Sequence, residues 1–228
     1  MSDLLLMQAI DIKRGFPTVD GTFWAVNGIS MTVVRHKLTV LKGRSGSGKT
    51  TLMNSLGALD YPTSGEVLFD GKPITKMSEL RRDKLRRTEF GFAFQSVALI
   101  GIMTAFENVD FVLRISGYPP RERKSRVQEC LERVGLGSRM NHLPPELSGG
   151  EQQRVAIARA FAHKPKVIFA DEPTAELDTN TGLLVVKIFK DLIEQKEATV
   201  IMTTHDPGLM EVADKVYELA DGVIVSEL

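Results

Sequence analysis

The sequence lacks several features that mark secreted and membrane-spanning proteins. Cys130 is the single cysteine among 228 residues, which excludes an internal disulfide framework and suits a reducing compartment. No apolar run approaches the roughly 18 residues that a membrane-spanning helix needs. Residues 1–7 have neither the basic region nor the extended apolar region of a signal peptide. We therefore expect any path across a membrane to belong to another polypeptide.

The sequence also has no surplus of charge of either sign. Lysine plus arginine number 29, and so do aspartate plus glutamate, so the formal net charge is zero. Nucleic-acid-binding proteins usually carry a basic surplus, and no nucleic-acid partner is expected. Basic clusters occur at 81–87 and 121–126, but acidic residues are interleaved with both. Solvated helix faces explain the clusters better than contact with anionic lipid heads or with an acidic helix of a partner, which stays the alternative.

A glycine-rich segment fits the phosphate-binding pattern G-x-x-x-x-G-K-[ST] without a mismatch. A short apolar strand at 38–41 precedes it and a predicted helix at 49–56 follows it, which is the context that the motif requires. Glycines let backbone N–H groups approach phosphate oxygens, and a helix N-terminus favours anions. We expect Lys49 to reach the β- and γ-phosphates and Thr50 to bind Mg²⁺. The nucleotide-binding residues expected here are Arg44, Ser45, Gly46, Ser47, Gly48, Lys49, Thr50 and Thr51.

A second element fits the same chemistry. The apolar strand at 167–170 leads into two carboxylates, Asp171 and Glu172. Open α/β sheets bind ligands at the carboxyl ends of their strands, so we expect Asp171 beside Mg²⁺. Glu172 is expected to face the γ-phosphate, where a carboxylate can polarise an attacking water. An acidic strand end alone is a common feature, but beside a phosphate loop it predicts nucleotide hydrolysis.

The segment 147–154, which reads LSGGEQQR, resembles the signature sequence of ABC ATPases. Together with the phosphate loop, it makes essentially the whole chain resemble the nucleotide-binding subunit of an ABC transporter. The resemblance implies the α/β class: a P-loop NTPase core with a mainly parallel sheet, an N-terminal antiparallel β layer and a helical insert. It implies one ABC ATPase domain over 1–228. The RecA-like core and β layer are expected at about 1–94 and 165–228, and the Q-loop, helical subdomain and signature helix at about 95–164.

The resemblance also assigns roles to single residues. Phe16 takes the place of the aromatic residue that stacks on adenine, and Gln95 that of the glutamine that contacts Mg²⁺ and senses the membrane partner. His205 takes the place of the switch histidine at the γ-phosphate. Ordinary packing is the plainer alternative for Phe16, and a structural histidine for His205. The residues implied to meet the ATP of a second subunit are Ser148, Gly149, Gly150, Gln152 and Asp178.

Segments at 52–54, 56–60, 62–65, 107–109 and 147–160 resemble the macrolide-export and lipoprotein-release branch of the family. The implied protein is an ATPase that uses ATP and Mg²⁺, dimerises around two ATP and drives export or mechanical release of peptide, drug or lipoprotein. Its implied partners are a second copy and integral-membrane permease subunits with a large extracytoplasmic domain, at the cytoplasmic face of the membrane. One alternative is an ATP-switched regulator of a membrane complex, as in the cell-division relative. Another is a soluble ABC ATPase of DNA repair or ribosomes, whose usual added domains this chain lacks.

The pattern along the chain predicts the main elements. Strands at 4–12, 29–34 and 67–69 are expected in the smaller antiparallel layer, and the stretch 104–142 is expected to be almost wholly helical. Three further expectations concern caps, core and turns. Thr104 and Ser148 should cap helices; Leu184, Ile188 and Leu192 should be core; and Asp221-Gly222 should form a hairpin turn.

Three positions depart from the family pattern. His36-Lys37 stands where members often have Gly-Glu, Lys42 replaces a small or apolar residue, and Glu176 adds an acid before Asp178. None removes a catalytic group. The shape of the turn and the polarity of the subunit contact therefore stay open.

Overall fold

A computed structural model describes residues 4–175, 177–204 and 207–228. The chain forms two compact units, the first made of Met1–Arg86 with Ile201–Leu228 and the second of Arg87–Val200. Helix α2 (Glu79–Thr88) and strand β8 (Thr199–Thr203) each begin in one unit and end in the other. These boundaries do not coincide with those expected at about 94/95 and 164/165, so the functional subdomains stay a prediction.

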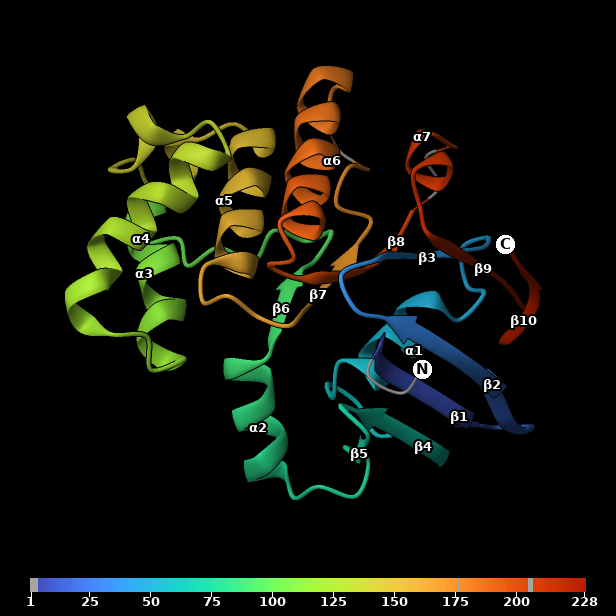
Figure 1. Ribbon diagram of the computed structural model, residues 1–228. Helices are drawn as coiled ribbons and strands as arrows, with labels where there is room; N and C mark the ends of the chain where they lie inside the picture. Colours follow the sequence, from blue (N-terminus) through green and yellow to red (C-terminus); the bar gives the residue numbers. More distant parts are fainter. Residues whose placement is uncertain (1–3, 176, 205–206) are drawn as a thin grey trace. The chain divides into compact units, whose positions relative to one another are not determined.

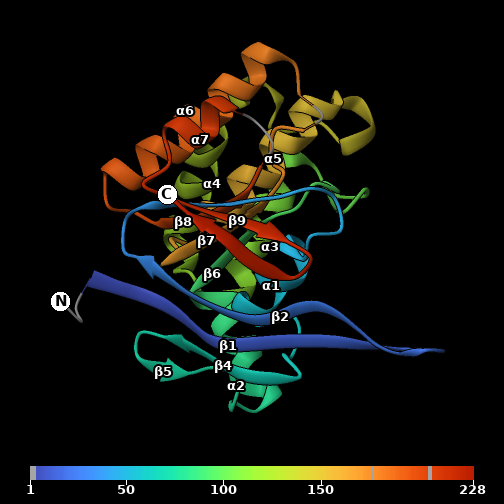
Figure 2. The ribbon, with the colours of Figure 1, turned by 90° about the vertical axis from the view of Figure 1, so that its right-hand side faces the viewer.

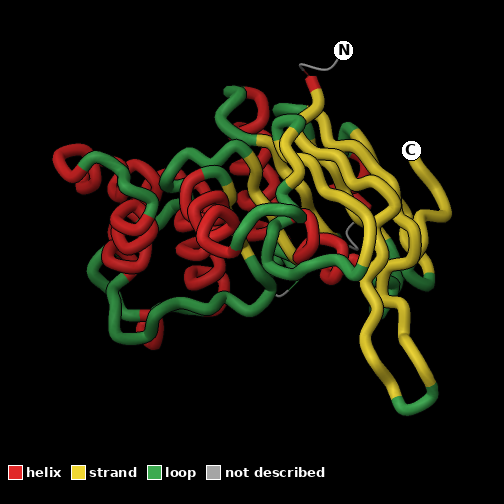
Figure 3. The backbone as a smooth tube through the Cα atoms, turned by 90° about the horizontal axis from the view of Figure 1, so that it is seen from below, coloured by secondary structure: helices red, strands yellow, loops and turns green. Residues whose placement is uncertain are grey.

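The first unit contains the antiparallel layer. Its strands are β1 (Leu5–Thr18), β2 (Gly21–Val34), β4 (Ser64–Phe69) and β5 (Lys72–Pro73), in the order β2-β1-β4-β5. Strands β1 and β2 lie side by side as one long hairpin (Figures 2 and 3). The expected strands are confirmed, but β1 and β2 are longer than predicted. Polar and exposed residues between 13 and 24 weaken the alternation there, and pairing across the hairpin extends the strands.

The first unit also contains part of the parallel sheet. Strands β3 (Leu38–Lys42) and β9 (Lys215–Ala220) pair in parallel, and β10 (Val223–Glu227) returns antiparallel to β9. The turn between β9 and β10 is the predicted one, with φ of 48° at Asp221 and 77° at Gly222. Helix α1 (Lys49–Leu56) follows β3 and has the predicted bounds, and the short α7 (Pro207–Glu211) precedes β9.

The second unit has a parallel strand pair, β6 (Phe90–Ala93) and β7 (Val167–Asp171). Aromatic rings hold it together, since Phe169 lies 5.4 Å from both Phe90 and Phe92, measured between ring centroids. Helix α5 (Gly149–Phe161) packs directly on β6. A Cβ atom at Gly91 would lie 2.0 Å from the Ala160 carbonyl oxygen, so only glycine allows this approach.

The remaining helices of the second unit are α3 (Ala105–Ile115), α4 (Pro120–Arg133) and α6 (Thr179–Glu194), with two short 3₁₀ turns at Gly137–Arg139 and Pro144–Glu146. Helices α3, α4 and α5 form one cluster (Figure 1). The predicted cap of α3 is confirmed, because Thr104 and Glu107 form a reciprocal capping box. No helix among the described residues is long and apolar enough to cross a membrane.

Two predictions about side chains need comment. Ile188 and Leu192 are core residues as expected, but Leu184 is only partly buried and its neighbour Val185 is fully buried instead. In the basic clusters, Arg82 and Arg126 are buried and donate to backbone carbonyl oxygens, Arg82 to Asp60 and Arg126 to Ala162 and Phe161. Structural arginines therefore account for part of each cluster.

Candidate nucleotide-binding site

The phosphate loop runs from the end of β3 into α1 inside the first unit. Gly43, Gly46 and Gly48 have φ values of 151°, 79° and 101°, which ordinary side chains rarely adopt. A Cβ atom at Gly48 would lie 2.2 Å from the Ala25 carbonyl oxygen, so that position has no room for a side chain. Gly48 is also the N-cap of α1 and makes no side-chain cap. No side-chain cap therefore covers the start of α1, and a helix N-terminus favours an anion.

Lys49 is held inside this loop. Its side chain is 7% exposed, and Nζ donates hydrogen bonds of 2.6 Å to the Gly43 carbonyl and 3.0 Å to the Arg44 carbonyl. Ser47 Oγ is buried with no hydrogen-bond partner among the described residues. A caged ammonium, an unpaired buried hydroxyl and an uncapped helix end together suit a bound phosphate group. The predicted loop residues therefore fit ATP, with Thr50 exposed at the first turn of α1.

The β1–β2 hairpin lies against the same loop. Pairing shifts between Arg14 and Gly15, so that Ala25 of β2 is the unpaired residue of a bulge. The Ala25 carbonyl is the group that abuts Gly48. Phe16, whose cross-strand partner is Phe23, is 39% exposed. Its ring is thus partly exposed on the unit that carries the phosphate loop and is not a packed core aromatic, and its role in stacking on adenine stays a prediction.

The second unit carries the predicted catalytic carboxylates at the end of β7. Asp171 and Glu172 are both half-buried, and Glu172 has a φ of 45°. A left-handed backbone costs a non-glycine residue about 1–2 kcal/mol, and such strain is concentrated at functional sites. The chain turns sharply at Glu172 into the buried Pro173. Glu172 therefore lies in the turn just after β7 and not in the strand itself.

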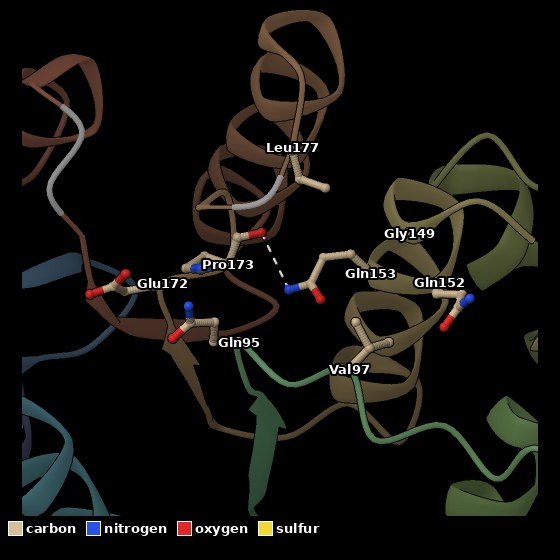
Figure 4. Close-up of a pocket in the computed structure, with 8 residues that line it drawn as sticks. All are labelled: Gln95, Val97, Gly149, Gln152, Gln153, Glu172, Pro173 and Leu177. Carbon is tan, nitrogen blue, oxygen red and sulfur yellow. Dashed lines mark hydrogen bonds between the residues drawn. The ribbon is translucent and has the colours of Figure 1, made fainter.

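A pocket of about 180 Å³ collects several predicted residues of the second unit. In Figure 4, Gln95 and Glu172 lie on one side of it, and Gly149 and Gln152 lie on the other. Gln153 lies between them and is 5% exposed; its Nε2 donates to the Phe94 carbonyl at 3.5 Å and to the Pro173 carbonyl at 3.3 Å. Sequence reasoning missed Gln153, because the signature pattern does not say where its side chain points.

The signature helix α5 begins as predicted. Ser148 caps it and forms a capping box with Glu151, and the hydrogen bond from the Ser148 backbone N–H holds the pKa of Glu151 below its usual value. A Cβ atom at Gly149 would meet nothing within 4 Å among the described residues. Gln152 donates to the carbonyls of Pro144 and Leu147, at 3.0 and 3.1 Å, so here its amide nitrogen fixes the chain before the helix.

Among the remaining predicted site residues, the structure describes Asp178 but not His205. Asp178 caps α6, accepting from Asn180 N at 3.0 Å and from Thr181 N at 3.1 Å; a further hydrogen bond from the Thr181 hydroxyl is the main cause of its lowered pKa. His205 and Glu176 lie outside the described residues. Cys130 is buried, and desolvation raises the pKa of its thiol to about 12, as is typical of a structural cysteine.

Two of the departures from the family pattern have local explanations. His36 adopts a φ of 53°, a left-handed conformation in which glycine is the usual residue. Lys42 lies 3.5 Å from the Glu218 carboxylate across the β3–β9 pair.

Comparisons with known proteins agree with this geometry. The ABC transporter family profile matches residues 26–175. The chain is 43% identical to lipoprotein-releasing system ATP-binding protein LolD 2 of Rhodopirellula baltica, over 96% of this chain and 89% of that protein. It is 40% identical to macrolide export ATP-binding/permease protein MacB of Vibrio parahaemolyticus, over all of this chain but only 34% of that protein.

Solved structures give the same answer. The dimeric structure of MJ0796, a bacterial ABC transporter cassette, matches with a TM-score of 0.93 and 35% identity over 98% of both chains. The same cassette in a post-hydrolysis state with ADP and Pi matches with a TM-score of 0.92. These findings confirm the predicted fold, the ATPase class with ATP and Mg²⁺, and the branch, and they favour a transport-type role over the regulatory alternative. The chain therefore belongs to the ABC transporter family, as an ATP-binding cassette related to the macrolide-export and lipoprotein-release ATPases.

Proposed function

We propose that this cassette powers a separate membrane permease, and that it hydrolyses ATP only where two copies meet. The observation that carries the proposal is the start of α5, where Ser148 caps the helix in a capping box with Glu151 and Gly149 faces open space among the described residues. No residue described here fills that surface. The γ-phosphate of an ATP held by a second copy is a suitable occupant, because a helix N-terminus favours an anion.

The chain's own residues divide the work. Lys49 and the loop N–H groups grip the phosphates, and Phe16 stacks on adenine. Glu172 accepts a proton from the attacking water, which is worth about 10²–10⁴ in rate for a general base. Bound Mg²⁺ would neutralise phosphate charge, and Thr50, Gln95 and Asp171 are the residues that would hold it. His205 is proposed to contact the γ-phosphate, and Asp178 to reach across the dimer.

This division makes the dimer depend on ATP. A ligand moves a two-state equilibrium from 1:99 to 99:1 when it favours one state by about 5.5 kcal/mol. A γ-phosphate held by the loop of one copy and by Ser148, Gly149 and Gly150 of the other can supply such a preference. Hydrolysis removes that shared contact, so the dimer reopens. The proposed helical subdomain, at about 95–164, carries the motion to the permease.

The names of the relatives suggest the class of partner. One is named as part of a lipoprotein-releasing system and the other as a macrolide export ATP-binding/permease protein, of which this chain matches about a third. We infer an integral-membrane permease with a large extracytoplasmic domain, and we place the cassette at the cytoplasmic face of the membrane. The proposed cargo is a peptide, a drug or a lipoprotein that is exported or released.

Co-purification from native membranes tests the proposal. A tagged cassette should recover a permease, and its ATPase rate should change when that permease is removed. The rate of the cassette alone should rise more steeply than its concentration, because two copies build each site. A strictly monomeric preparation that hydrolyses ATP at the full rate would contradict the shared site. Salt-sensitive DNA binding would instead favour the soluble DNA-repair class.

A further inference from the structure

The ring of Phe16 does not stand alone on the surface. Arg14, two residues earlier on the same strand, places its guanidinium carbon 4.6 Å from the centroid of the Phe16 ring. At this distance the cation is attracted by the face of the ring. The guanidinium therefore occupies one face of the ring, and a flat ligand can stack only on the opposite face. Phe16 remains 39% exposed with Arg14 in place.

Asp60 fixes the orientation of that guanidinium. Arg14 Nε donates to one carboxylate oxygen of Asp60 at 2.7 Å and Nη2 donates to the other at 3.1 Å. Such a bidentate pair sets the plane of the guanidinium as well as its position. The two side chains are 26% and 32% exposed, so water screens the pair only partly. Asp60 is itself held, since Arg82 donates to its backbone carbonyl at 2.8 Å and the Tyr61 N–H donates to its carboxylate at 2.8 Å.

Backbone bonds tie the same strand to the loop after α1. Thr63 N donates to the Lys13 carbonyl at 2.7 Å, and Gly15 N donates to Thr63 Oγ1 at 3.0 Å. The loop is bound in turn to α1, because the N–H groups of Leu59 and Asp60 both donate to the Asn54 carbonyl, at 2.9 and 3.2 Å. Helix α1 begins at Lys49, so these contacts connect the Phe16 strand to the helix that starts at the phosphate loop.

We propose that Arg14, aligned by Asp60, is a positioning residue that sets the tilt of Phe16 for a purine base. The inference rests on the proposed role of Phe16 in stacking on adenine. Without the guanidinium the phenyl ring can rotate on its exposed strand, and ordering the ring then opposes nucleotide binding. The base is stacked on one face of the ring while the cation holds the other. Neither Arg14 nor Asp60 touches the phosphates in this scheme.

Two probes separate the base from the phosphates. MgADP carries both, whereas magnesium pyrophosphate lacks the base, and neither brings the γ-phosphate that the dimer shares. Arg14→Met and Asp60→Asn should each raise the dissociation constant of MgADP by about twofold to fivefold. Both variants should bind magnesium pyrophosphate like the unmodified chain. Arg14→Lys, which retains a cation near the ring, should bind MgADP with intermediate affinity.

Phe16→Leu completes a double-mutant cycle. Alone it should weaken MgADP by about fivefold to a hundredfold, the range for stacking on one base. Adding Arg14→Met should weaken MgADP no further, because the ring that Arg14 positions is gone. Arg35→Met is the matched control: it removes the Arg35–Asp70 ion pair, which lies in the same unit and is 31% and 23% exposed. That control should leave MgADP binding unchanged.

The outcomes distinguish the two proposals. If Phe16→Leu leaves MgADP binding unchanged, the adenine role of Phe16 is wrong and the role of Arg14 is overturned with it. If Phe16→Leu weakens MgADP but Arg14→Met does not, the stacking role stands and only the positioning role of Arg14 is overturned. If Arg14→Met weakens pyrophosphate as much as MgADP, Arg14 supports the fold of the unit in general, and the inference is again overturned.

Discussion

The chain has two glycine-rich helix starts, and they are built in opposite ways. At α1 the N-cap is Gly48, which has no capping side chain and no room for one, and the buried Lys49 follows. At α5 the N-cap is Ser148, which is fully bonded in a capping box, and Gly149 after it faces open space among the described residues. The first glycine is required by the protein's own backbone. No described residue requires glycine at position 149, so we infer that the group that fills the space beside Gly149 comes from outside the chain.

The largest expected effect comes from a variant that binds ATP between the two helix starts but does not cleave it. Glu172→Gln removes the proposed base while keeping the size of the side chain, so turnover should fall by about 10²–10⁴. ATP binding should persist, and dimers should accumulate in size-exclusion chromatography with ATP. Glu194→Gln, at an exposed carboxylate of α6, is the control and should leave turnover unchanged. A normal rate in Glu172→Gln would show that another group activates the water.

The α1 start should govern the binding of ATP by a single copy. Lys49→Met removes the ammonium from the loop, and loss of charge-assisted hydrogen bonds should weaken ATP by about tenfold to a hundredfold. Titration calorimetry at concentrations where the chain is monomeric measures this effect. Lys187→Met, at an exposed position on α6, should bind ATP normally. Unchanged ATP affinity in Lys49→Met would remove the contrast between the two helix starts.

The α5 start should matter only when two copies meet. Gly149→Ala meets no described atom within 4 Å, so the monomer should fold normally and gain up to about 1 kcal/mol from the added helix propensity. Turnover should nevertheless fall at least about tenfold, because the methyl group lies where the partner's phosphate docks. ATP affinity of the monomer should be unchanged.

Gly182→Ala is the control for this variant, since Gly182 also lies in a helix with nothing within 4 Å of an added Cβ. It should gain similar stability and retain turnover. If Gly149→Ala turned over ATP as fast as Gly182→Ala, nothing would dock on the start of α5.

The smallest expected effect concerns the capping box of α5. The pKa of Glu151 is lowered from 4.5, first by the hydrogen bond from the Ser148 N–H. Its contribution to stability is therefore complete above pH 4.5 and is lost as the pH falls through the lower folded-state value. Glu151→Gln should lower the Tm at pH 7 by less than about 4 °C, and the difference should shrink toward pH 3. A difference that is the same at both pH values would mean that the charge of Glu151 does not matter.

Features set by neighbouring residues could be predicted from the sequence. Some features depend only on interactions within a few residues, so the sequence pattern alone determines them. They are the caps at Thr104 and Ser148, the turn at Asp221-Gly222 and the bounds of α1. The fold class came from the resemblance of the phosphate loop and the signature segment to those of ABC ATPases, and the alternation of strands and helices agreed with it. The sequence could name the residues of the candidate site, but it could not say which of them contact one another.

What the sequence could not predict depends on distant residues. The extension of β1 needs its partner β2, and the roles of Gln153 and Arg14 depend on where carbonyls and rings lie after folding. The left-handed turn at Glu172 has no sequence signal, because glutamate, unlike aspartate or asparagine, is not enriched at positive φ. Leu184 fits the helical period, yet Val185 is the residue that faces the core.

The missing side chain at Gly91 has a mechanical consequence. Because an added methyl group would collide with the Ala160 carbonyl, α5 and β6 meet backbone to backbone with no compressible layer between them. Strand β6 ends at Ala93, two residues before Gln95. A tilt of the signature helix is therefore transmitted directly to that strand. A larger residue at position 91 would push α5 and β6 apart, and less of the helix movement would reach Gln95.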